Sequence, residues 1–248
     1  MAKIGVKHFL VGELHEASDG TATYGSPISP GKAVTASVNI NSNSAELYAE
    51  DALAESDYSF NSGDITLGID NDDLETQAFI LGHTITNGEM VSNVNDVSKY
   101  LGVGRIVTKI VNGARKYRVL FLNKTKFSEP SESDSTKGES VSFATHELPG
   151  KIHELRNGDW RKSKEFSTES EAVAYLHSLF GLTYTAEGFT SDGSATVTLA
   201  HAPAAISNVT VNGNTLSADS YSFTGQTVTF TAALTSGDSI VVAYTYSA

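Results

Sequence analysis

The chain has 248 residues, which is enough for one large domain or for two smaller ones with a core each. It contains no cysteine, which excludes disulfides, thiolate metal sites and cysteine nucleophiles, and which suits a reducing compartment. Its formal net charge of -12 argues against a reader of duplex DNA, because neutralising phosphates requires clustered lysine and arginine.

No segment has the composition of a membrane span or of a secretory signal. The N-terminal apolar run is too short for a signal, and about 18 consecutive apolar residues, as a spanning helix needs, occur nowhere. The sequence therefore predicts a soluble protein that is made in the cytoplasm and has no membrane span.

The first 70 residues have the composition of strands. Residues 4–13, 32–48 and 64–70 are strand-like, and glycines and prolines mark the turns between the first two. Within this part lies the acidic segment ELYAEDALAESD, residues 46–57. It has no lysine or arginine to offset its five carboxylates, which are those of Glu46, Glu50, Asp51, Glu55 and Asp57. Such a cluster of like charges raises the question of what the segment faces.

A short helix is expected in NDDLETQAFILG, residues 71–82. Asn71 or Asp72 can cap its first turn, and Gly82 can end it. The residues that share its apolar face are Leu74, Ala78 and Leu81. Helix capping explains the acids here better than a calcium-binding loop, because Leu74 occupies a position where such a loop needs an oxygen ligand.

Charge is distributed unevenly along the chain. Between residues 33 and 98 there are twelve acidic residues and no lysine or arginine, whereas residues 99–128 hold eight basic residues and no acid. In a monomer the two segments could lie side by side. Alternatively, the acidic and basic faces of identical subunits could meet head to tail, a contact that generates rings or helical filaments. Both interpretations remain open at this point.

The clearest local signal is RIVTKIVNGARKYRVLFL, residues 105–122. Asn112 and Gly113 are the preferred pair for a two-residue type I′ hairpin turn, because both positions need positive φ. Such a turn gives one face a core-like set of side chains, namely Ile106, Thr108, Ile110, Tyr117, Val119 and Phe121. The opposite face, called the basic face below, carries Arg105, Lys109, Lys116 and Arg118, with the two lysines directly opposed. We expect an acidic partner for it, and residues 46–57 of the same or a neighbouring subunit are the nearest candidate.

The next segments indicate a loop, a strand and a helix. Residues 129–139 are polar and predict a surface loop, and SVSFATHEL, residues 140–148, predicts a strand. FSTESEAVAYLHSLFG, residues 166–181, is the strongest helix signal, since Thr168 and Glu171 have capping-box spacing and the final glycine is a stop. The apolar face of this helix is expected to contain Ala172, Leu176, and Leu179 or Phe180.

The composition changes near Leu182. From there to Ala248 the chain has no lysine or arginine, and short alternating segments are separated by Asn-Gly, Thr-Gly and Ser-Gly turns. This pattern is typical of a small β-sandwich. The expected organisation is two domains, residues 1–181 and 182–248, in a mostly β chain with one or two short helices.

Several segments of the first domain, in their order along the chain, resemble the major tail protein of long-tailed bacteriophages. They are GVKHFLVGEL, DGTATYG, AELYAEDALAESDYSFNSGDITLGID with the short helix after it, NGARKYRVLFLNKTKFSEP and GESVSFATHELPGKI. The resemblance covers about residues 1–181. It implies a tail-tube β-sandwich with a flanking helix, which assembles into hexameric rings whose inner sheets join around a DNA-wide channel. It also implies that rings stack into the tail tube, and that a long loop at residues 46–57 reaches toward the adjoining ring.

The resemblance further implies a structural protein of the virion tail, made in the cytoplasm of a host bacterium. Its expected partners are other copies of itself and the tape-measure, tail-terminator and distal-tail proteins. DNA is expected only in transit, without sequence-specific binding, and an acidic subunit suits this role because a weakly repulsive wall lets DNA slide. Residues 182–248 resemble the immunoglobulin-like domains appended to many phage structural proteins. They are expected either to decorate the tube, with weak contact to the host surface, or to have no required role.

Enzymatic sites have little support in the sequence. His146 and His153, in HELPGKIH, match no common metal spacing, and neither a nucleophile elbow nor a catalytic triad pattern nor a phosphate loop occurs. We therefore predict no enzymatic activity, no cofactor and no metal, and we interpret Trp160 as a partly buried anchor. The alternative function is that of a monomeric two-domain β adhesin or carbohydrate-binding module.

Overall fold

The computed structural model describes residues 2–49, 52–70, 73–132 and 145–247, and leaves the side chains of residues 2, 45–49, 52–55 and 57 undescribed. The described chain is mostly β with two short α-helices, which confirms the predicted fold class. Neither helix has the length and apolar character needed to span a bilayer. The chain divides into two compact units, Met1–Ala172 and Val173–Ala248, ahead of the boundary expected near Leu182.

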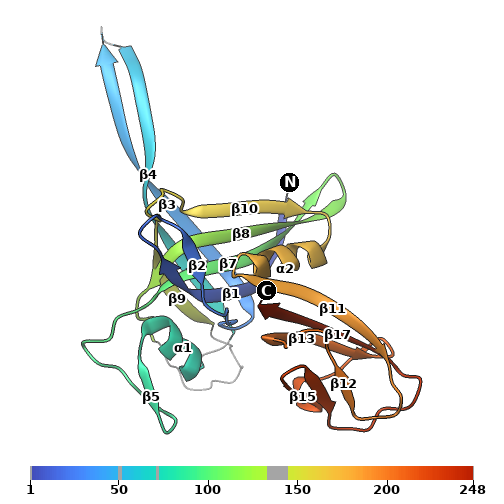
Figure 1. Cartoon of the computed structure of the whole chain (residues 1–248). Coiled ribbons are helices and arrows are strands. Elements are labelled where there is room, and N and C mark those ends of the chain that lie inside the picture. Colours follow the sequence, from blue (N-terminus) through green and yellow to red (C-terminus); the bar gives the residue numbers. More distant parts are fainter. Residues whose placement is uncertain (1, 50–51, 71–72, 133–144, 248) are drawn as a thin grey trace, which may run out of the picture. The chain divides into compact units, whose positions relative to one another are not determined.

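The first unit is built on one eight-stranded antiparallel sheet (Figure 1). The order of its strands is β2-β1-β7-β8-β9-β4-β3, and β10 pairs with β8 beside β9. The strands are β1 (Ala2–Glu16), β2 (Ala22–Tyr24), β3 (Ala33–Ala49), β4 (Ala52–Ile69), β7 (Tyr100–Val111), β8 (Ala114–Phe127), β9 (His146–His153) and β10 (Arg161–Phe166). A separate small hairpin consists of β5 (Thr84–Thr86) and β6 (Glu89–Val91).

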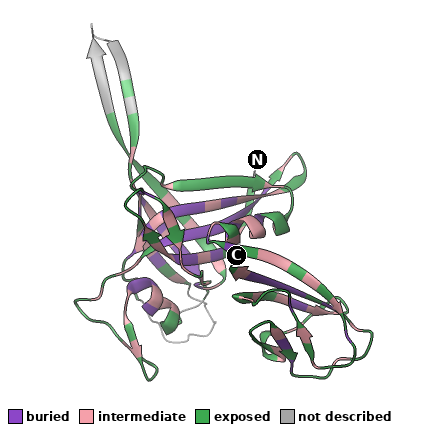
Figure 2. Cartoon of the chain, viewed as in Figure 1, coloured by how far each residue is buried: buried purple, intermediate pink, exposed green. Residues whose placement is uncertain are grey.

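The core of this unit lies between the two halves of the sheet. Inward-facing side chains of β1, β7 and β8 form one cluster with those of β4 and β9, as a β-sandwich requires. Its fully buried members include Phe9, Val11, Ile65, Leu67, Leu101, Val103, Leu122, Leu148 and Ile152. The buried residues, purple in Figure 2, therefore concentrate in the central strands.

The hairpin of β7 and β8 has the predicted register. Asn112 and Gly113 both have positive φ, at 51° and 79°, and Lys109 pairs directly with Lys116. The two faces also carry the predicted side chains. The burial of these side chains differs from the prediction, because both faces of β7 are covered. Arg105 and Lys109 of the basic face are buried, whereas Ile110 of the core-like face is 40% exposed.

The first helix, α1 (Leu74–Leu81), lies where the sequence predicts it, but Asp73 caps it. The Asp73 carboxylate accepts a hydrogen bond from the Thr76 amide at 3.0 Å, and Gly82 ends the helix with φ 83°. Asn71 and Asp72, the caps expected from the sequence, lie outside the described residues. The predicted buried face is wrong at Leu74, which is 45% exposed because it lies at the helix start, whereas Ile80 is fully buried.

The second helix, α2 (Glu169–Ser178), begins with the predicted capping box. The Thr168 hydroxyl accepts a hydrogen bond from the Glu171 amide, and the Glu171 carboxylate accepts one from the Thr168 amide, both at 3.3 Å. Ala172, Leu176 and Phe180 are buried, as expected for the apolar face.

Two features near β9 and β10 differ from the sequence prediction. The strand expected at residues 140–148 begins at His146 in the described chain and continues through Pro149 to His153, and residues 133–144 lie outside the described part. β10 was not predicted, because its sequence RKSKEF has too few apolar residues to show a strand pattern.

The second unit contains two small sheets around a separate core. The four-stranded sheet has the order β11-β17-β13-β14, and the three-stranded sheet has the order β12-β16-β15. The elements are β11 (Leu182–Thr190), β12 (Thr196–Thr198), β13 (Ala205–Val211), β14 (Asn214–Thr215), the 3-10 helix η1 (Ala218–Ser220), β15 (Tyr221–Thr224), β16 (Thr227–Phe230) and β17 (Ser239–Ser247). Val209, Val228, Ile240, Val242 and Tyr244 are completely buried between them.

Candidate functional site

The acidic segment of the sequence lies in a two-stranded extension of β3 and β4. β9 pairs with β4 only from Gly63 to Ile69, and beyond that point the described parts of β3 and β4 pair only with each other, up to Ala49 and Ala52. We call residues 42–49 and 52–60 the ribbon. Eight residues at about 3.3 Å each give it a length of about 25 Å, and Figure 1 shows it projecting away from the sheet.

The ribbon corrects the expectation of a loop at residues 46–57. Glu46 pairs with Ser56 and Leu47 with Glu55, so the described backbone of this segment is β-paired. The structure therefore brings Glu46, Glu55 and Asp57 close together on two adjacent strands, while Glu50 and Asp51 lie outside the described residues. Clustered like charges in a narrow ribbon repel one another unless a cation is near.

Aromatic stacking fixes the root of the ribbon. The rings of Phe60 and Trp160 are parallel within 6°, with centroids 4.6 Å apart, and both residues are partly buried against the core. The guanidinium of Arg161 lies 4.5 Å from the centre of the Trp160 ring, a cation–π geometry. Trp160 is thus a partly buried anchor, and its role is to hold the strand pair where the pair leaves the sheet.

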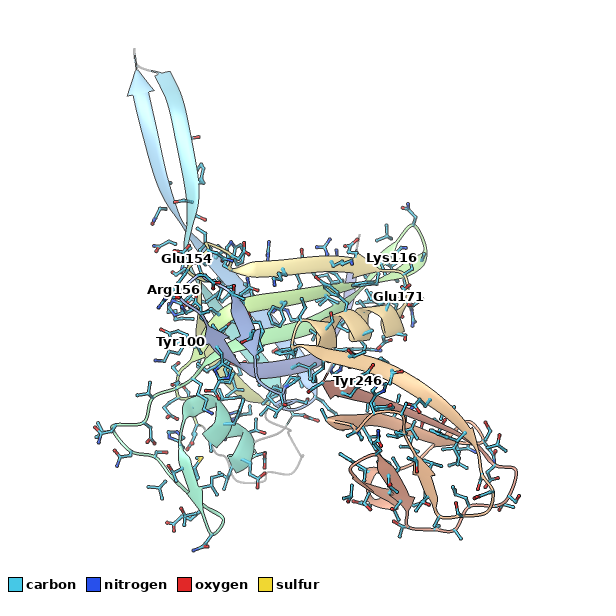
Figure 3. All side chains as sticks on the ribbon, viewed as in Figure 1. Tyr100, Lys116, Glu154, Arg156, Glu171 and Tyr246 are labelled. Carbon is cyan, nitrogen blue, oxygen red and sulfur yellow. The ribbon has the colours of Figure 1, made fainter. Side chains whose placement is uncertain are left out.

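The basic face lies on β7 and β8, as the hairpin register requires, but its acidic partner within the chain is Glu165 of β10. Glu165 Oε1 accepts hydrogen bonds from Lys109 Nζ and from Arg118 Nε, each at 2.7 Å. Lys116 instead donates to the Ser167 hydroxyl at 2.9 Å. Figure 3 shows Lys116 at the end of β10 that leads into α2. Within the described residues the acidic partner of this face is thus Glu165, and its expected pairing with residues 46–57 stays a prediction.

Electrostatics at the basic face follow from this arrangement. The hydrogen bonds from Lys109 and Arg118 lower the pKa of Glu165, so this carboxylate is charged at neutral pH. Burial lowers the pKa of Arg105 to about 10, and the neighbouring charge of Arg161 acts in the same direction. Arg105 nevertheless stays protonated at neutral pH. Glu165 and Arg161 were missed in the sequence because no apolar alternation marks their strand.

Histidines and carboxylates do not form a metal site in the described chain. The described residues contain no group of three or more potential ligands of that kind. His146 and His153 stand at opposite ends of β9. His153 lies edge-on to Tyr100 at 5.9 Å, and burial together with Lys124 lowers its pKa, which favours the neutral ring.

One histidine outside the predicted set is held between two carboxylates. His83 Nδ1 lies 2.8 Å from Asp96 Oδ2, and His83 Nε2 lies 2.8 Å from Glu129 Oε1, although the second contact is not aligned as a hydrogen bond. The side chain of His83 is only 4% exposed. The hydrogen bond to Asp96 raises the pKa of His83 against the opposing effect of burial, so the ion pairs tie the segment after α1 to residues 96 and 129.

A second surface cluster joins the start of β1 to the start of α2. A bulge at His8, which has φ 54°, breaks the alternation of β1 and lets both Lys7 and His8 reach Glu169, at 3.0 and 3.2 Å. The cluster lines a shallow depression of about 430 Å³ together with Ser29 and Lys32. Its charges are already paired, so it fixes β1 rather than offering free ligands.

Comparison with known proteins gives no identification. No protein-family model matches the chain, and no curated protein sequence matches it.

Proposed function

We propose that this protein is a self-assembling structural subunit of the tail tube of a long-tailed bacteriophage. In this role copies of the chain would form rings, on the pattern of the hexameric rings of the family it resembles, and the rings would stack into a conduit for DNA. The partners are other copies of itself and, by the same resemblance, the tape-measure, tail-terminator and distal-tail proteins. Its place is the virion tail, after synthesis in the host cytoplasm.

The ribbon is the observation that carries this proposal. A two-stranded hairpin without a third strand or a covering layer is marginally stable in water, so a ribbon of about 25 Å is favoured only where another surface receives it. β3 is also an edge strand of 17 residues, and Ala33–Ala49 contains neither lysine nor arginine nor proline. Monomeric proteins usually protect a long edge strand with such residues. In proteins that assemble, an unprotected edge strand can pair with another chain.

Charge supports the same proposal. The acids of the ribbon lie on β3 and β4 and the cations of the basic face on β7 and β8, so contact between the ribbon of one copy and the basic face of another would join opposite charges. Unlike surfaces that meet head to tail produce rings or open stacks rather than closed dimers. The net charge of -12 suits a conduit that DNA must leave without being held.

The second unit has a separate role in this proposal. Its core is distinct from that of the first unit, and its exposed strand faces are rich in threonine and serine rather than in charge. We assign it to decoration of the tube, with weak contact to the host surface. A chain ending at Gly181 is expected to assemble as the full chain does, and loss of assembly in that variant would place the second unit in the tube itself.

The test of the proposed function is electron microscopy of the purified full chain by negative staining, with light scattering on the same sample. Rings or tubes that grow with concentration support it. A chain that remains a monomer and is retained by glycans would support the adhesin alternative instead.

A further inference from the structure

Four cations lie on one face of the first unit, on strands β7, β8 and β10. We call them the cationic cluster, and they are Arg105, Lys109, Arg118 and Arg161. Arg105 pairs with Leu120, which pairs in turn with Ser163 of β10. Arg118 pairs with Glu165 of the same strand. Paired residues, and residues two apart along a strand, share a face, so the four cations and Glu165 all lie on the same side of the sheet.

Glu165 neutralises only part of this cluster. Its carboxylate forms ion pairs with Lys109 and with Arg118, and no other carboxylate of the described residues forms an ion pair with a member of the cluster. Within the described part of the chain the cluster therefore has three positive charges in excess. Like charges gathered on one face repel one another, so an anion that binds between them is favoured.

Arg105 is the member of the cluster with the least favourable surroundings. It is 7% exposed, and its Nη1 atom is buried and has no hydrogen-bond partner in the described structure. Burial lowers the pKa of Arg105, and the charge of Arg161 lowers it further, which places the two guanidinium groups near each other. A buried guanidinium beside a second one is unfavourable unless an anion is supplied, because desolvation removes the water that would otherwise stabilise the charge.

Arg161 is held in place at an edge of the sheet that solvent can reach. β10 pairs only with β8 among the described strands, Figure 1 shows it at the margin of the sheet, and Arg161 is exposed. The Arg161 guanidinium lies 4.5 Å from the centre of the Trp160 ring, and this cation–π contact restricts its position. Trp160 is itself fixed by stacking on Phe60. The pair thus combines one guanidinium that is open to solvent with one that is buried.

We infer that Arg105 and Arg161 form a binding site for a small free oxyanion of the phosphate class. Guanidinium groups suit phosphate because their planar donors bind two oxygens at once through charge-assisted hydrogen bonds. A phosphate group carries about 1.5 to 2 negative charges at neutral pH, so it balances the excess charge of the cluster more fully than a carboxylate does. The site lies within a single copy of the chain, so it goes beyond the proposed function and does not depend on assembly.

Charge favours a small anion over the phosphates of a DNA backbone. The net charge of -12 opposes the approach of a long polyanion to this chain. A single phosphate responds chiefly to the charges within a Debye length, which is about 8 Å at physiological ionic strength, and there the cluster dominates. Because both sources present the same phosphate chemistry, competition between them is part of the test.

Isothermal titration calorimetry of the full chain with inorganic phosphate, at constant ionic strength, tests the site. Phosphate should bind in a saturable manner and more tightly than acetate, which carries a single charge. Arg161→Gln should weaken phosphate binding at least about ten-fold, because it removes charge-assisted hydrogen bonds. Lys162→Gln is the matched control. Lys162 is exposed and adjacent to Arg161 but lies on the opposite face of β10, so the same change in net charge should leave the affinity unaltered.

A second variant tests whether Arg105 lacks an anion in the free protein. Arg105→Met keeps an unbranched side chain and removes the charge. In chloride buffer without phosphate it should unfold at the same temperature as the original chain or at a higher one, because an unpaired buried charge is lost. Millimolar phosphate should then raise the unfolding temperature of the original chain but not that of Arg105→Met, because a ligand stabilises only the form that binds it.

Three results would overturn the site. The first is phosphate binding that is absent from the original chain or equal in Arg161→Gln. The second is an Arg105→Met variant that unfolds well below the original chain without phosphate, because Arg105 would then already be stabilised. The third is a duplex oligonucleotide that displaces phosphate and binds more tightly, because the occupant would then be the DNA backbone. Each readout is independent of rings or tubes, so failure of the site and failure of the proposed function are distinguishable.

Discussion

Lys109 and Lys116 occupy directly opposed positions in the β7–β8 hairpin, yet their ammonium groups do not face an open surface together. Lys109 is buried and reaches Glu165, whereas Lys116 reaches the Ser167 hydroxyl. Glu165 of β10 and Ser167, which follows the end of β10, thus keep apart two like charges that would otherwise repel each other. Glu165 is therefore the residue that makes the basic face compatible with a folded monomer.

Replacing Glu165 by glutamine should destabilise the chain at neutral pH, because Lys109 stays buried without a carboxylate. The sign of the pH effect follows from the lowered pKa of Glu165. A depressed folded-state pKa contributes stability above the ordinary value of 4.5, and this contribution is lost as the pH falls through the folded-state pKa. Urea unfolding at pH 7 and at pH 3.5 should therefore show a smaller pH difference in Glu165→Gln than in the original chain. Glu147→Gln, at an exposed position of β9, is the control, and an equal effect there would contradict the role of Glu165.

Removal of the ring that anchors the ribbon should destabilise the first unit. Trp160→Ala deletes a partly buried side chain that stacks on Phe60, and we expect a loss of about 2–4 kcal/mol in the free energy of unfolding. Trp160→Phe keeps a stacking ring and should lose clearly less. Unfolding followed by circular dichroism measures both, since Trp160 is the only tryptophan and its loss removes the fluorescence signal. Equal losses in the two variants would show that stacking is not what holds the ribbon root.

Two glycines with the same backbone conformation should respond differently to alanine. Gly82 and Gly113 have φ 83° and 79°, so a side chain is strained at both, by about 1–2 kcal/mol. At Gly113 an added Cβ meets open space, whereas at Gly82 it would clash with the Val97 carbonyl oxygen. Gly82→Ala should therefore lower the free energy of unfolding more than Gly113→Ala. Equal losses by urea titration would contradict the close approach of residue 97 to the helix end.

The ion pairs of His83 predict a pH dependence of opposite sign to that of Glu165. A raised folded-state pKa contributes stability below the ordinary value of 6.5, and that stability is lost as the pH rises through the folded-state pKa. The amides from α1 to residue 96 should thus have lower protection factors in hydrogen exchange above that pH, once the intrinsic base-catalysed rise in exchange rate is divided out. His83→Gln should remove the pH dependence. An NMR titration that gives His83 a pKa below 6.5 would contradict the contacts with Asp96 and Glu129.

The sequence correctly predicted those elements that are specified by residues close together in the chain. The Asn112-Gly113 turn sets the register of β7 and β8 from the pair Val111–Ala114 to the pair Val103–Leu122, and the Thr168–Glu171 capping box locates α2, because both signals depend on neighbours within four residues. The helix α1 was predicted with the wrong cap, since three consecutive polar residues precede it and each can accept the same hydrogen bond.

The candidate site was predicted only in part, because its partners are distant in sequence. Alternation identified the basic face but not Glu165, which meets it through pairing of β10, a strand whose charged sequence resembles a loop. The acidic segment was expected to be a loop, and only the pairing of Ala45 with Asp57 and of Leu47 with Glu55 shows it to be a ribbon. Burial of Arg105 is a property of the assembled sandwich, and no pattern within β7 distinguishes it from an exposed arginine.

The most direct test of the account is negative-stain electron microscopy of the purified full chain over a concentration series, at low and at high salt. For a tail-tube subunit, rings or tubes should appear as concentration rises and recede as salt screens the acidic and basic surfaces. A chain that remains monomeric at every concentration and at both salt levels would contradict it.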